Sequence, residues 1–256
     1  MVSESVYKDL NKVNKKHFKD MVKLYDKKMY KKSLKKCESI LETQPNHGET
    51  LAMKALIYNT VGRRAEARDT INKAIMCNLK SFTSWHIKGM IERSERHFAD
   101  AKKCFAQSSK IEEDNQKILR DLLLLELQVR DYENAVTSIT KIMQKQARNK
   151  VFSTCYFLVN HLSGNYEVAE HFIDQNRDFL LTKMSRVEIN ELYMYEASLY
   201  RDHGKYEEAL KVLKDNEKEI VDKVARLELL AELYVHTEKL EEAIKCYEQL
   251  IKKNPS

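Results

Sequence analysis

Two residue types that bend or end regular structure are scarce in the sequence. Its 256 residues include only 5 Gly and 2 Pro, too few for the many turns of a β-sandwich or β-barrel. No apolar run approaches the length that spans a bilayer, and the start, MVSESVYKDLNKVNKK, lacks the apolar stretch of a secretory signal. These absences favour an all-α protein in the cytoplasm without a membrane partner.

Motifs that hold metals or cofactors are absent as well. The five cysteines are odd in number and never form a C-x-x-C pair, so we expect reduced thiols that act as small core residues. The eight histidines show neither H-E-x-x-H nor a Cys/His pairing at zinc spacing, and no G-x-G or P-loop pattern occurs. We therefore expect no metal, no cofactor and no catalytic residue in this chain, and we expect that it is not an enzyme.

A 34-residue repeat runs through the chain. The stretch FTSWHIKGMIERSERHFADAKKCFAQSS (82–109) has the aromatic, glycine and small-residue spacing of a tetratricopeptide (TPR) unit, which is a helix-turn-helix. With Ala101 numbered as position 20 of its unit, small residues recur at that position with differences of 34, 34, 34, 34, 40 and 34. They are Ser33, Ala67, Ala101, Ala135, Ala169, Ala209 and Ala243.

This periodicity predicts an all-α fold, a right-handed TPR α-solenoid of about seven repeats that forms a single array over residues 1–256. The slip to 40 indicates a lengthened second helix over 171–184, and Ser185 and Glu188 form a predicted capping box at the start of the next helix. Because no polar capping helix follows the last repeat, we expect a piece of a longer solenoid. The approximate repeat boundaries are 14–47, 48–81, 82–115, 116–149, 150–189, 190–223 and 224–256.

Individual residues of the repeats carry further expectations. We expect Trp85 in the core and Gly89 at a close approach of the two helices of its repeat. The glycines Gly62, Gly164 and Gly204 occupy the predicted turn between helices. His86 is interpreted as a polar groove residue rather than a ligand, and an acid in a first helix, Glu126, is expected to face the groove.

Position 9 of a TPR unit points into the concave groove, and here it is apolar in five repeats. This pattern predicts a groove for a partner helix or for another part of the chain, although a tight superhelix could bury the same positions. The Asn and Lys clamp by which many TPR domains hold chaperone tails is missing. The predicted groove residues are Val22, Leu56, Met90, Leu124 and Leu158.

The positive charge is concentrated at the start of the chain. Residues 1–36 hold twelve Lys and four acidic residues, a net of +8, whereas the whole chain carries +6. A helix expected over Ser5–Lys28 places six lysines within an arc of about 100°. Clustered lysines favour sequence-independent contact with a phosphate backbone, although a solvated helix face gives the same pattern. The lysines of this predicted ribosome- or RNA-binding face are Lys8, Lys12, Lys15, Lys16, Lys19 and Lys23.

Three stretches carry a more specific resemblance than the repeat positions do. They are HGETLAMKAL (47–56), LKSFTSWHIKGMIERS (79–94) and DNQKILRDLLLLELQVRDYE (114–133). Each resembles the amino-terminal region of the auxiliary subunit of the NatA amino-terminal acetyltransferase. The likeness runs from about residue 18 to 256, and it includes YEEALKVL (206–213) and the slipped spacing before it. Residues 1–17 look longer and more lysine-rich than in that family.

The resemblance implies a non-catalytic TPR scaffold. In that family a separate GNAT-fold subunit binds acetyl-CoA and acetylates nascent chains, and the auxiliary subunit holds it at the ribosomal exit tunnel. The implied partners are therefore the GNAT-type catalytic subunit and the ribosome, through its RNA and exit-tunnel proteins. Contacts with the catalytic subunit are expected mostly beyond residue 256. Two alternatives remain open: a TPR adaptor for another assembly or for chaperones, and an RNA-binding helical-repeat protein.

Overall fold

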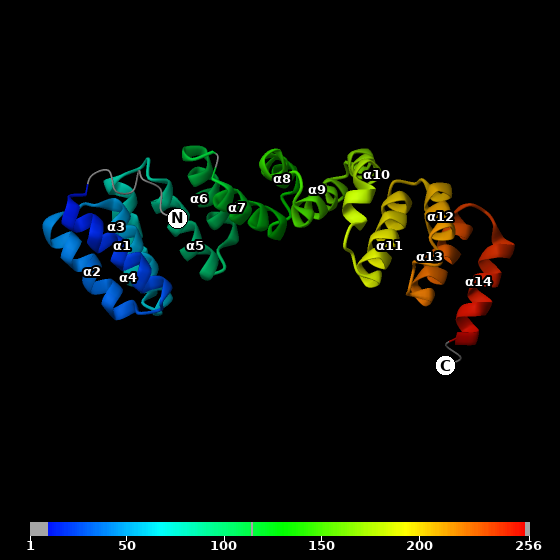
Figure 1. The fold of residues 1–256 in the computed structure, drawn as a ribbon, viewed down its shortest axis with the longest axis horizontal. Coiled ribbons are helices and arrows are strands. Elements are labelled where there is room, and N and C mark those ends of the chain that lie inside the picture. Colours follow the sequence, from blue (N-terminus) through cyan, green and yellow to red (C-terminus); the bar gives the residue numbers. More distant parts are fainter. Residues whose placement is uncertain (1–9, 114, 254–256) are drawn as a thin grey trace. The chain divides into compact units, whose positions relative to one another are not determined.

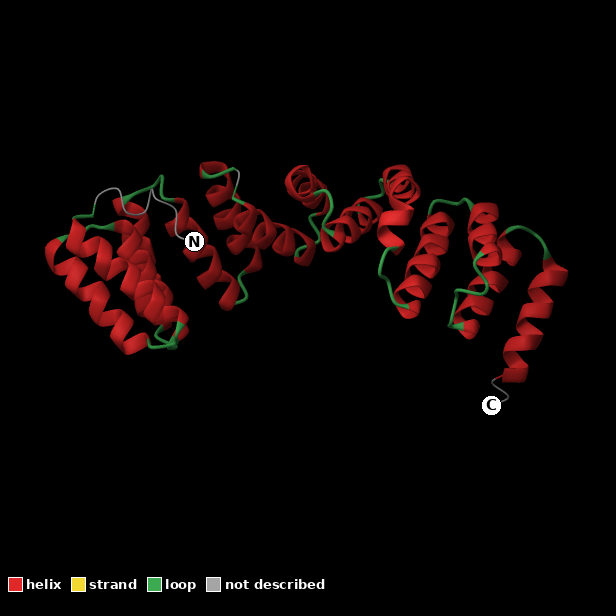
Figure 2. Ribbon diagram, viewed as in Figure 1, coloured by secondary structure: helices red, strands yellow, loops and turns green. Residues whose placement is uncertain are grey.

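The computed structural model describes residues 10–113 and 115–253, and these residues form fourteen α-helices and no strand. The chain divides into two compact units, Met1–Ile142 and Met143–Ser256. Consecutive helices are joined by short turns (Figure 1, Figure 2). They pack as the pairs α1–α2, α3–α4 and α5–α6 in unit 1 and α9–α10, α11–α12 and α13–α14 in unit 2, whereas α7 and α8 contact each other less closely. The all-α prediction is confirmed for the described part of the chain.

The helices alternate as the first and second members of the predicted repeats. Unit 1 holds α1 Lys12–Asp26, α2 Tyr30–Thr43, α3 Gly48–Thr60, α4 Arg64–Cys77, α5 Phe82–Ser94, α6 Phe98–Ile111, α7 Gln116–Gln128 and most of α8 Tyr132–Gln146. Unit 2 holds α9 Lys150–Leu162, α10 Tyr166–Leu181, α11 Arg186–Asp202, α12 Tyr206–Asp215, α13 Lys223–His236 and α14 Leu240–Lys253.

The small residues at position 20 lie where the second helix of each pair meets the core. All seven are buried, with exposed fractions from 0% to 3%. In unit 1, Ala67 packs among large apolar side chains such as Phe18, Ile57 and Ile71, and Ala101 belongs to a cluster with Phe105. In unit 2 the corresponding core includes Leu213, Leu227 and Leu230. The recurrence of small residues therefore marks the close approach of the paired helices, as predicted.

Each turn between the paired helices contains one residue with a left-handed backbone. Gly62, Gly164 and Gly204 have φ of +85°, +79° and +79°, which confirms their predicted turn positions. Four other repeats place Lys28, Arg96, Arg130 and Glu238 at the same point with φ between 58° and 65°. These seven positions repeat with the same differences of 34, 34, 34, 34, 40 and 34, so the backbone keeps the period even where glycine is missing.

The slipped spacing between repeats 5 and 6 has only partly the predicted origin. Helix α10 has 16 residues, against 14 in α2, α4 and α6. The following helix, α11, has 17 residues, against 13 in α3, α5, α7 and α9, so most of the slip lies in α11. Ser185 caps α11. The Ser185 hydroxyl accepts a hydrogen bond from the Glu188 amide at 3.3 Å, while the Glu188 carboxylate accepts one from the Ser185 amide at 2.7 Å. The capping box is confirmed.

Of two expectations about single residues of repeat 3, the one for Gly89 is confirmed and the one for Trp85 is not. An added Cβ on Gly89 would lie 2.7 Å from the ring of buried Phe105, so Gly89 does permit a close approach of α5 and α6. Trp85, however, is only half-buried. Its indole N–H donates to the Leu79 carbonyl at 2.9 Å, which holds the ring against the loop before α5, and the expectation of a core tryptophan was wrong.

Candidate functional site: the lysine face and the apolar groove of unit 1

Helix α1 begins later than the sequence suggested. The Asn11 side chain accepts a hydrogen bond from the Asn14 amide at 2.8 Å and caps a helix that starts at Lys12. Leu10 and Asn11 therefore lie outside the helix expected over Ser5–Lys28. The inward side of α1 consists of the buried residues Asn14, Phe18 and Met21. The Asn14 side-chain amide donates to the Thr43 hydroxyl at 2.8 Å, which anchors α1 to the end of α2.

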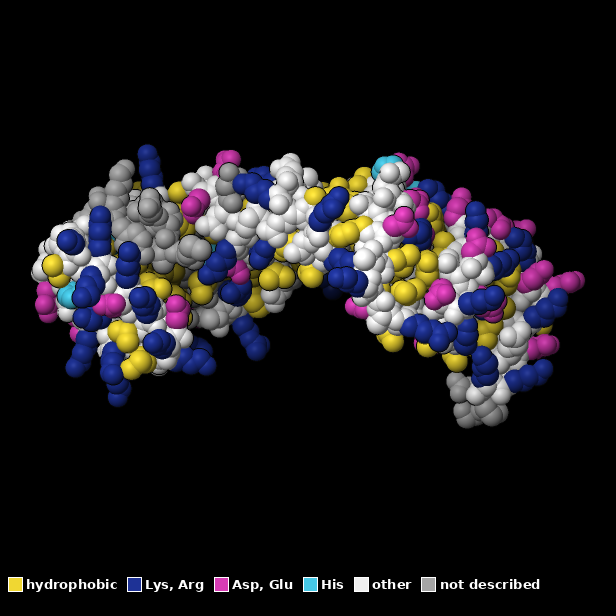
Figure 3. Space-filling model, viewed as in Figure 1, with side chains coloured by type: hydrophobic (Ala, Val, Ile, Leu, Met, Phe, Trp, Pro, Cys, Tyr) yellow, Lys and Arg dark blue, Asp and Glu magenta, His cyan; other side chains and the backbone are white. Residues whose placement is uncertain are grey.

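The predicted lysine face is exposed on α1 as far as the structure describes it. Lys12, Lys15, Lys16, Lys19 and Lys23 are all exposed, and Lys8 lies outside the described residues. We use "lysine face" below for these five described lysines. Figure 3 shows lysine and arginine side chains over the α1–α2 end of unit 1.

The surroundings of the lysine face differ from the sequence interpretation in two ways. Val13, expected on the apolar side of the helix, is 62% exposed, because its position turns it away from α2. Helix α2 adds three more exposed lysines, Lys31, Lys32 and Lys35. These three lysines contribute to the net charge of +8 over residues 1–36 but were not among the six predicted for the face, although the pattern KKSLKK places them on one side of a helix.

Three of the five predicted groove residues line one hollow of unit 1. Val22 of α1, Leu56 of α3 and Met90 of α5 border a cavity of about 390 Å³. We call this cavity the groove. Its floor is mainly apolar, and polar side chains stand among its lining residues. The other lining residues are Tyr25, Asp26, Met53, Phe82, Thr83, His86, Ile87, Glu112, Asn115, Lys117 and Ile118.

The polar residue predicted for the groove, His86, does line it. Its Nε2 lies 2.9 Å from Asp121 of α7, and Arg93 donates to the other carboxylate oxygen at 3.2 Å. Although desolvation opposes ionisation, the hydrogen bond from His86 and the nearby Arg93 charge hold the pKa of Asp121 below its ordinary value. This ionic cluster fixes the imidazole beside the groove and ties α5 to α7.

The two remaining predicted groove residues do not line this cavity. Leu124 of α7 is 60% exposed, and Leu158 belongs to unit 2, where it packs half-buried against Phe157 and its neighbours. Equivalent repeat positions thus have different environments, because the packing around each first helix varies from repeat to repeat.

Glu126 was expected to face the groove, and that expectation was wrong. The residue is buried, with 4% exposed, and one carboxylate oxygen has no hydrogen-bond partner within the described structure. Desolvation raises the pKa of this carboxyl; the Ser138 hydroxyl bond opposes the shift and the charge of Asp131 adds to it.

The cysteines match their expectation except at one position. All five are free thiols, and burial raises the pKa of Cys37 to about 12 and that of Cys104 to about 11. Cys77 is exposed at the end of α4 rather than in the core. Cys246 is buried as well and Cys155 is half-buried, and desolvation raises the pKa of both. Raised pKa values favour the protonated thiol, so these four cysteines are poor nucleophiles.

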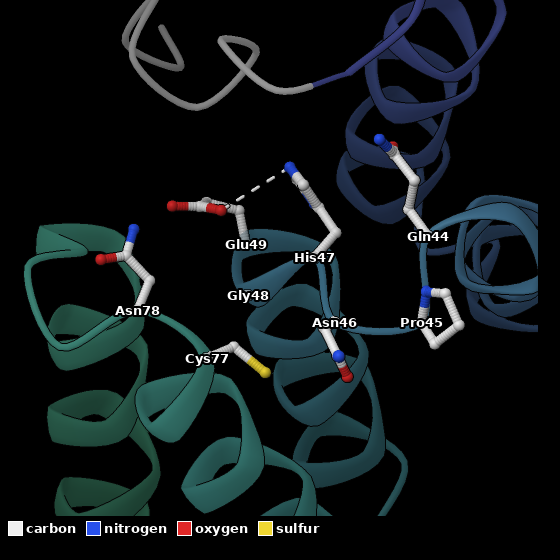
Figure 4. A pocket seen from close by; sticks show the side chains of 8 residues that line it. All are labelled: Gln44, Pro45, Asn46, His47, Gly48, Glu49, Cys77 and Asn78. Carbon is white, nitrogen blue, oxygen red and sulfur yellow. Dashed lines mark ion pairs between the residues drawn. The ribbon is translucent and has the colours of Figure 1, made fainter.

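Other cavities of similar size lie outside the predicted sites, and two of them involve buried polar residues. One of about 410 Å³ surrounds the start of α3, where the ring of His47 points towards Glu49 at 3.7 Å (Figure 4). Another, of about 380 Å³, lies in unit 2 beside the buried Glu196, which accepts two hydrogen bonds from Arg177 at 2.6 and 2.8 Å. Periodicity could not reveal either one, since both depend on polar residues that do not recur.

The described residues offer one grouping with metal-ligand chemistry, formed by Glu92, Glu95 and His97. Glu95 is already paired with Arg68, and the His97 ring lies 3.0 Å from Glu92. Internal ion pairs account for this cluster. Among residues 10–113 and 115–253, moreover, no helix combines the length and apolar character needed to cross a bilayer.

Comparison with known proteins shows what this combination of repeats resembles. A family profile described as "N-terminal acetyltransferase A, auxiliary subunit" matches residues 187–256. The N-terminal acetyltransferase A complex auxiliary subunit NAA15 of Arabidopsis thaliana is 34% identical over 242 residues, which cover 93% of this chain and 27% of the relative. The chain thus spans about a quarter of the length of that relative.

Solved structures agree with the sequence comparison. A chain in the structure of Naa15/Naa10 bound to HypK-THB matches with a TM-score of 0.85 and 31% identity, covering 95% of this chain and 37% of that one. A tetratricopeptide repeat protein from Parabacteroides merdae matches with a TM-score of 0.51 and 15% identity, over 95% of this chain and 94% of that one. The second likeness concerns the fold alone and confirms its TPR character.

Proposed function

Since this chain is related in sequence and fold to the auxiliary subunits of N-terminal acetyltransferase A, we propose that it is a non-catalytic scaffold for a separate acetyltransferase subunit. The observation that carries the proposal is the identity of 34% across 93% of the chain, joined to a TM-score of 0.85 with a chain of the Naa15/Naa10 structure. In this proposal acetyl-CoA binds the GNAT-type partner, this chain holds no cofactor, and the complex acts in the cytoplasm on nascent chains.

Depletion of the protein from its own cells tests this function. We expect N-terminal acetylation to fall on proteins that lose their initiator methionine, when acetylated and free amino termini are quantified by mass spectrometry. Re-expression of the protein should restore the acetylated fraction. Unchanged acetylation of those termini after depletion would contradict the proposal.

The lysine face supports a second part of the proposal, namely contact with the ribosome. Its five described lysines are exposed on one helix, and α2 adds exposed lysines beside them. Ribosomal RNA presents a dense array of phosphates, and lysines that neutralise phosphates release bound counterions. An anchor of this kind requires no base recognition, which suits a scaffold that serves many nascent chains.

Charge reversal at Lys12, Lys16 and Lys19 to Glu tests the anchor. Losing three phosphate contacts should weaken co-sedimentation with ribosomes and reduce the slope of log binding constant against log salt by about 2 to 3. The matched control reverses three exposed lysines of α14, namely Lys245, Lys252 and Lys253. Equal binding by the two triple variants would reject the lysine face as the anchor.

A further inference from the structure

The groove and the lysine face adjoin each other on α1. Lys15, Lys19, Val22 and Asp26 are spaced i, i+4, i+7 and i+11 along this helix, so they fall on one stripe of its surface. Val22 and Asp26 line the groove, and Lys15 and Lys19 therefore extend that edge towards the start of the helix. On the far side of the groove, Lys117 of α7 is another lining residue.

The floor of the groove suits aliphatic side chains. Its residues come from four first helices, α1, α3, α5 and α7, and they include Met53, Leu56 and Met90. Methionine is unbranched and adapts to the shape of what it contacts. The volume of about 390 Å³ lies near the lower end of the range of about 300 to 1,000 Å³ for ligand pockets. A few side chains can therefore fill this space, whereas a folded domain cannot.

The charged residues around the groove indicate which charge an occupant should carry on its polar side. The groove lining contains two carboxylates, Asp26 and Glu112, and one lysine, Lys117. Lys15 and Lys19 are exposed where the α1 edge continues beyond the groove, so the groove and this edge together carry three lysines against two carboxylates. An occupant that carries acidic residues is thus complementary to the surroundings. A phosphate backbone would also meet the lysines, but it would leave the apolar floor uncovered, so the two features together favour a protein segment.

We propose that the groove of unit 1 binds a short amphipathic helix of a partner protein, with aliphatic residues on one side and Glu or Asp on the other. This binding mode places the apolar stripe of a helix into a hydrophobic groove. The lysines beside Val22 then pair with the acidic side of the helix. The inference rests on the proposed function, because it adds one partner class to the scaffold, but the groove can be tested without the acetyltransferase.

A synthetic peptide provides the probe. It has about 15 residues, enough to form a helix on binding, with Leu on one face and Glu on the other, and it carries a fluorescent label. Two companion peptides replace all Glu by Lys, or all Leu by Ser. Fluorescence anisotropy against the full 256-residue protein should show saturable binding of the first peptide and at least tenfold weaker binding of both companions.

Variants then locate the binding site. Met90→Gln should weaken the peptide at least tenfold, because it places an amide in the apolar floor. Leu124→Gln is the matched control, since Leu124 holds the same repeat position but is exposed and lies outside the groove lining. Lys15→Glu should weaken binding and lower its dependence on salt. Circular dichroism spectra and melting curves that match the parent protein exclude unfolding as the cause.

Several results would overturn the inference. One is equal binding of the Glu and Lys peptides, and another is equal loss from Met90→Gln and Leu124→Gln. Displacement of the peptide by duplex RNA with no effect of Met90→Gln would assign the site to phosphates on the lysine face. A concentration-dependent dimer that Met90→Gln dissociates would make a second copy of the chain the occupant. Co-purification of the acetyltransferase subunit is measured separately. If Met90→Gln abolishes only peptide binding in the groove, the variant should retain as much acetyltransferase subunit as the parent protein.

Discussion

At the scale of single residues, Gly89 shows how one missing side chain sets a helix pair. Its Cα faces the ring of Phe105, and an added Cβ would lie 2.7 Å from two ring carbons. Phe105 is fully buried, so the ring has no free space to move into. The glycine is needed for packing rather than for backbone conformation, since it lies inside α5.

The overpacking in Gly89→Ala should cost about 1–3 kcal/mol. Alanine regains about 1 kcal/mol of helix propensity, so the free energy of unfolding should fall by up to about 2 kcal/mol. Urea denaturation measures the change. Adding Phe105→Leu to the variant should restore part of the loss, because the smaller side chain leaves room for the new methyl group. A stability equal to that of the parent protein would show that Phe105 shifts without strain.

Glu126 is the residue whose environment the sequence misjudged most. An acid in a first helix usually faces the open groove. The side chain of Glu126 on α7 is instead buried and hydrogen-bonded to Ser138 of α8, and one of its carboxylate oxygens has no hydrogen-bond partner in the described structure. Amphipathic periodicity could not show this, because its helix is apolar on both sides in the run LLLLELQV. The charges near the carboxyl come from Asp131, Lys102 and Lys141.

The raised pKa of Glu126 predicts a particular pH dependence. Because the folded pKa lies above the ordinary value, the folded state binds the proton more tightly than the unfolded state does. The ionised carboxylate therefore destabilises the fold, and stability falls as pH rises from the ordinary value through the raised one. Glu126→Gln should remove this dependence and raise the free energy of unfolding at pH 7 by about 1 kcal/mol.

Urea denaturation at pH 5 and at pH 7 checks this expectation. Glu133→Gln on α8 serves as the control, because Glu133 is exposed and no large effect is expected from it. Identical pH dependence in the parent protein and Glu126→Gln would contradict the account of the buried carboxyl.

At the scale of elements, the turn between paired helices is the most regular feature. After each first helix, the backbone N–H of the left-handed residue donates to the carbonyl three residues before it. The N–H of the next residue donates to the carbonyl five residues before its own position. In repeat 2 these bonds are Gly62 to Asn59 and Arg63 to Tyr58, at 3.1 and 2.8 Å. This is the arrangement of a Schellman motif, and the other six repeats form the same pair of bonds.

Exchanging the turn residues should change stability in opposite directions. Gly164→Ala has open space around the new Cβ, so its cost is backbone strain alone, about 1–2 kcal/mol. Arg96→Gly removes strain at an exposed position with φ of 65°, and after the entropy of glycine is counted it should gain about 0.5 kcal/mol. Thermal unfolding of the two variants provides the measurement. A loss of stability in Arg96→Gly equal to that in Gly164→Ala would refute the strain argument.

The elements also show how far the sequence alone could lead. The small residues at position 20, the lengthened α10 and the Ser185 capping box follow from spacing and local chemistry, and all were predictable. The four turns without glycine were not, because Lys, Arg and Glu carry no sequence mark of a left-handed backbone. The groove could be predicted only in part: Val22, Leu56 and Met90 line one cavity of unit 1, whereas Leu124 is 60% exposed and lies outside its lining.

At the scale of the whole molecule, periodicity gives the architecture, and similarity along most of the chain points to the family. Many unrelated proteins share TPR packing, as the match with 15% identity to a bacterial TPR protein shows. The likeness to a NatA auxiliary subunit instead reaches 34% identity over 93% of this chain. Partner binding is therefore the property to measure.

Affinity purification of the native protein at low salt, with mass spectrometry of every retained protein, tests the scaffold proposal most directly. We expect a GNAT-type acetyltransferase in stoichiometric amount, accompanied by ribosomal proteins that are lost when salt is raised. Recovery of chaperones or another assembly without any acetyltransferase would contradict the proposal and identify the chain as an adaptor of a different complex.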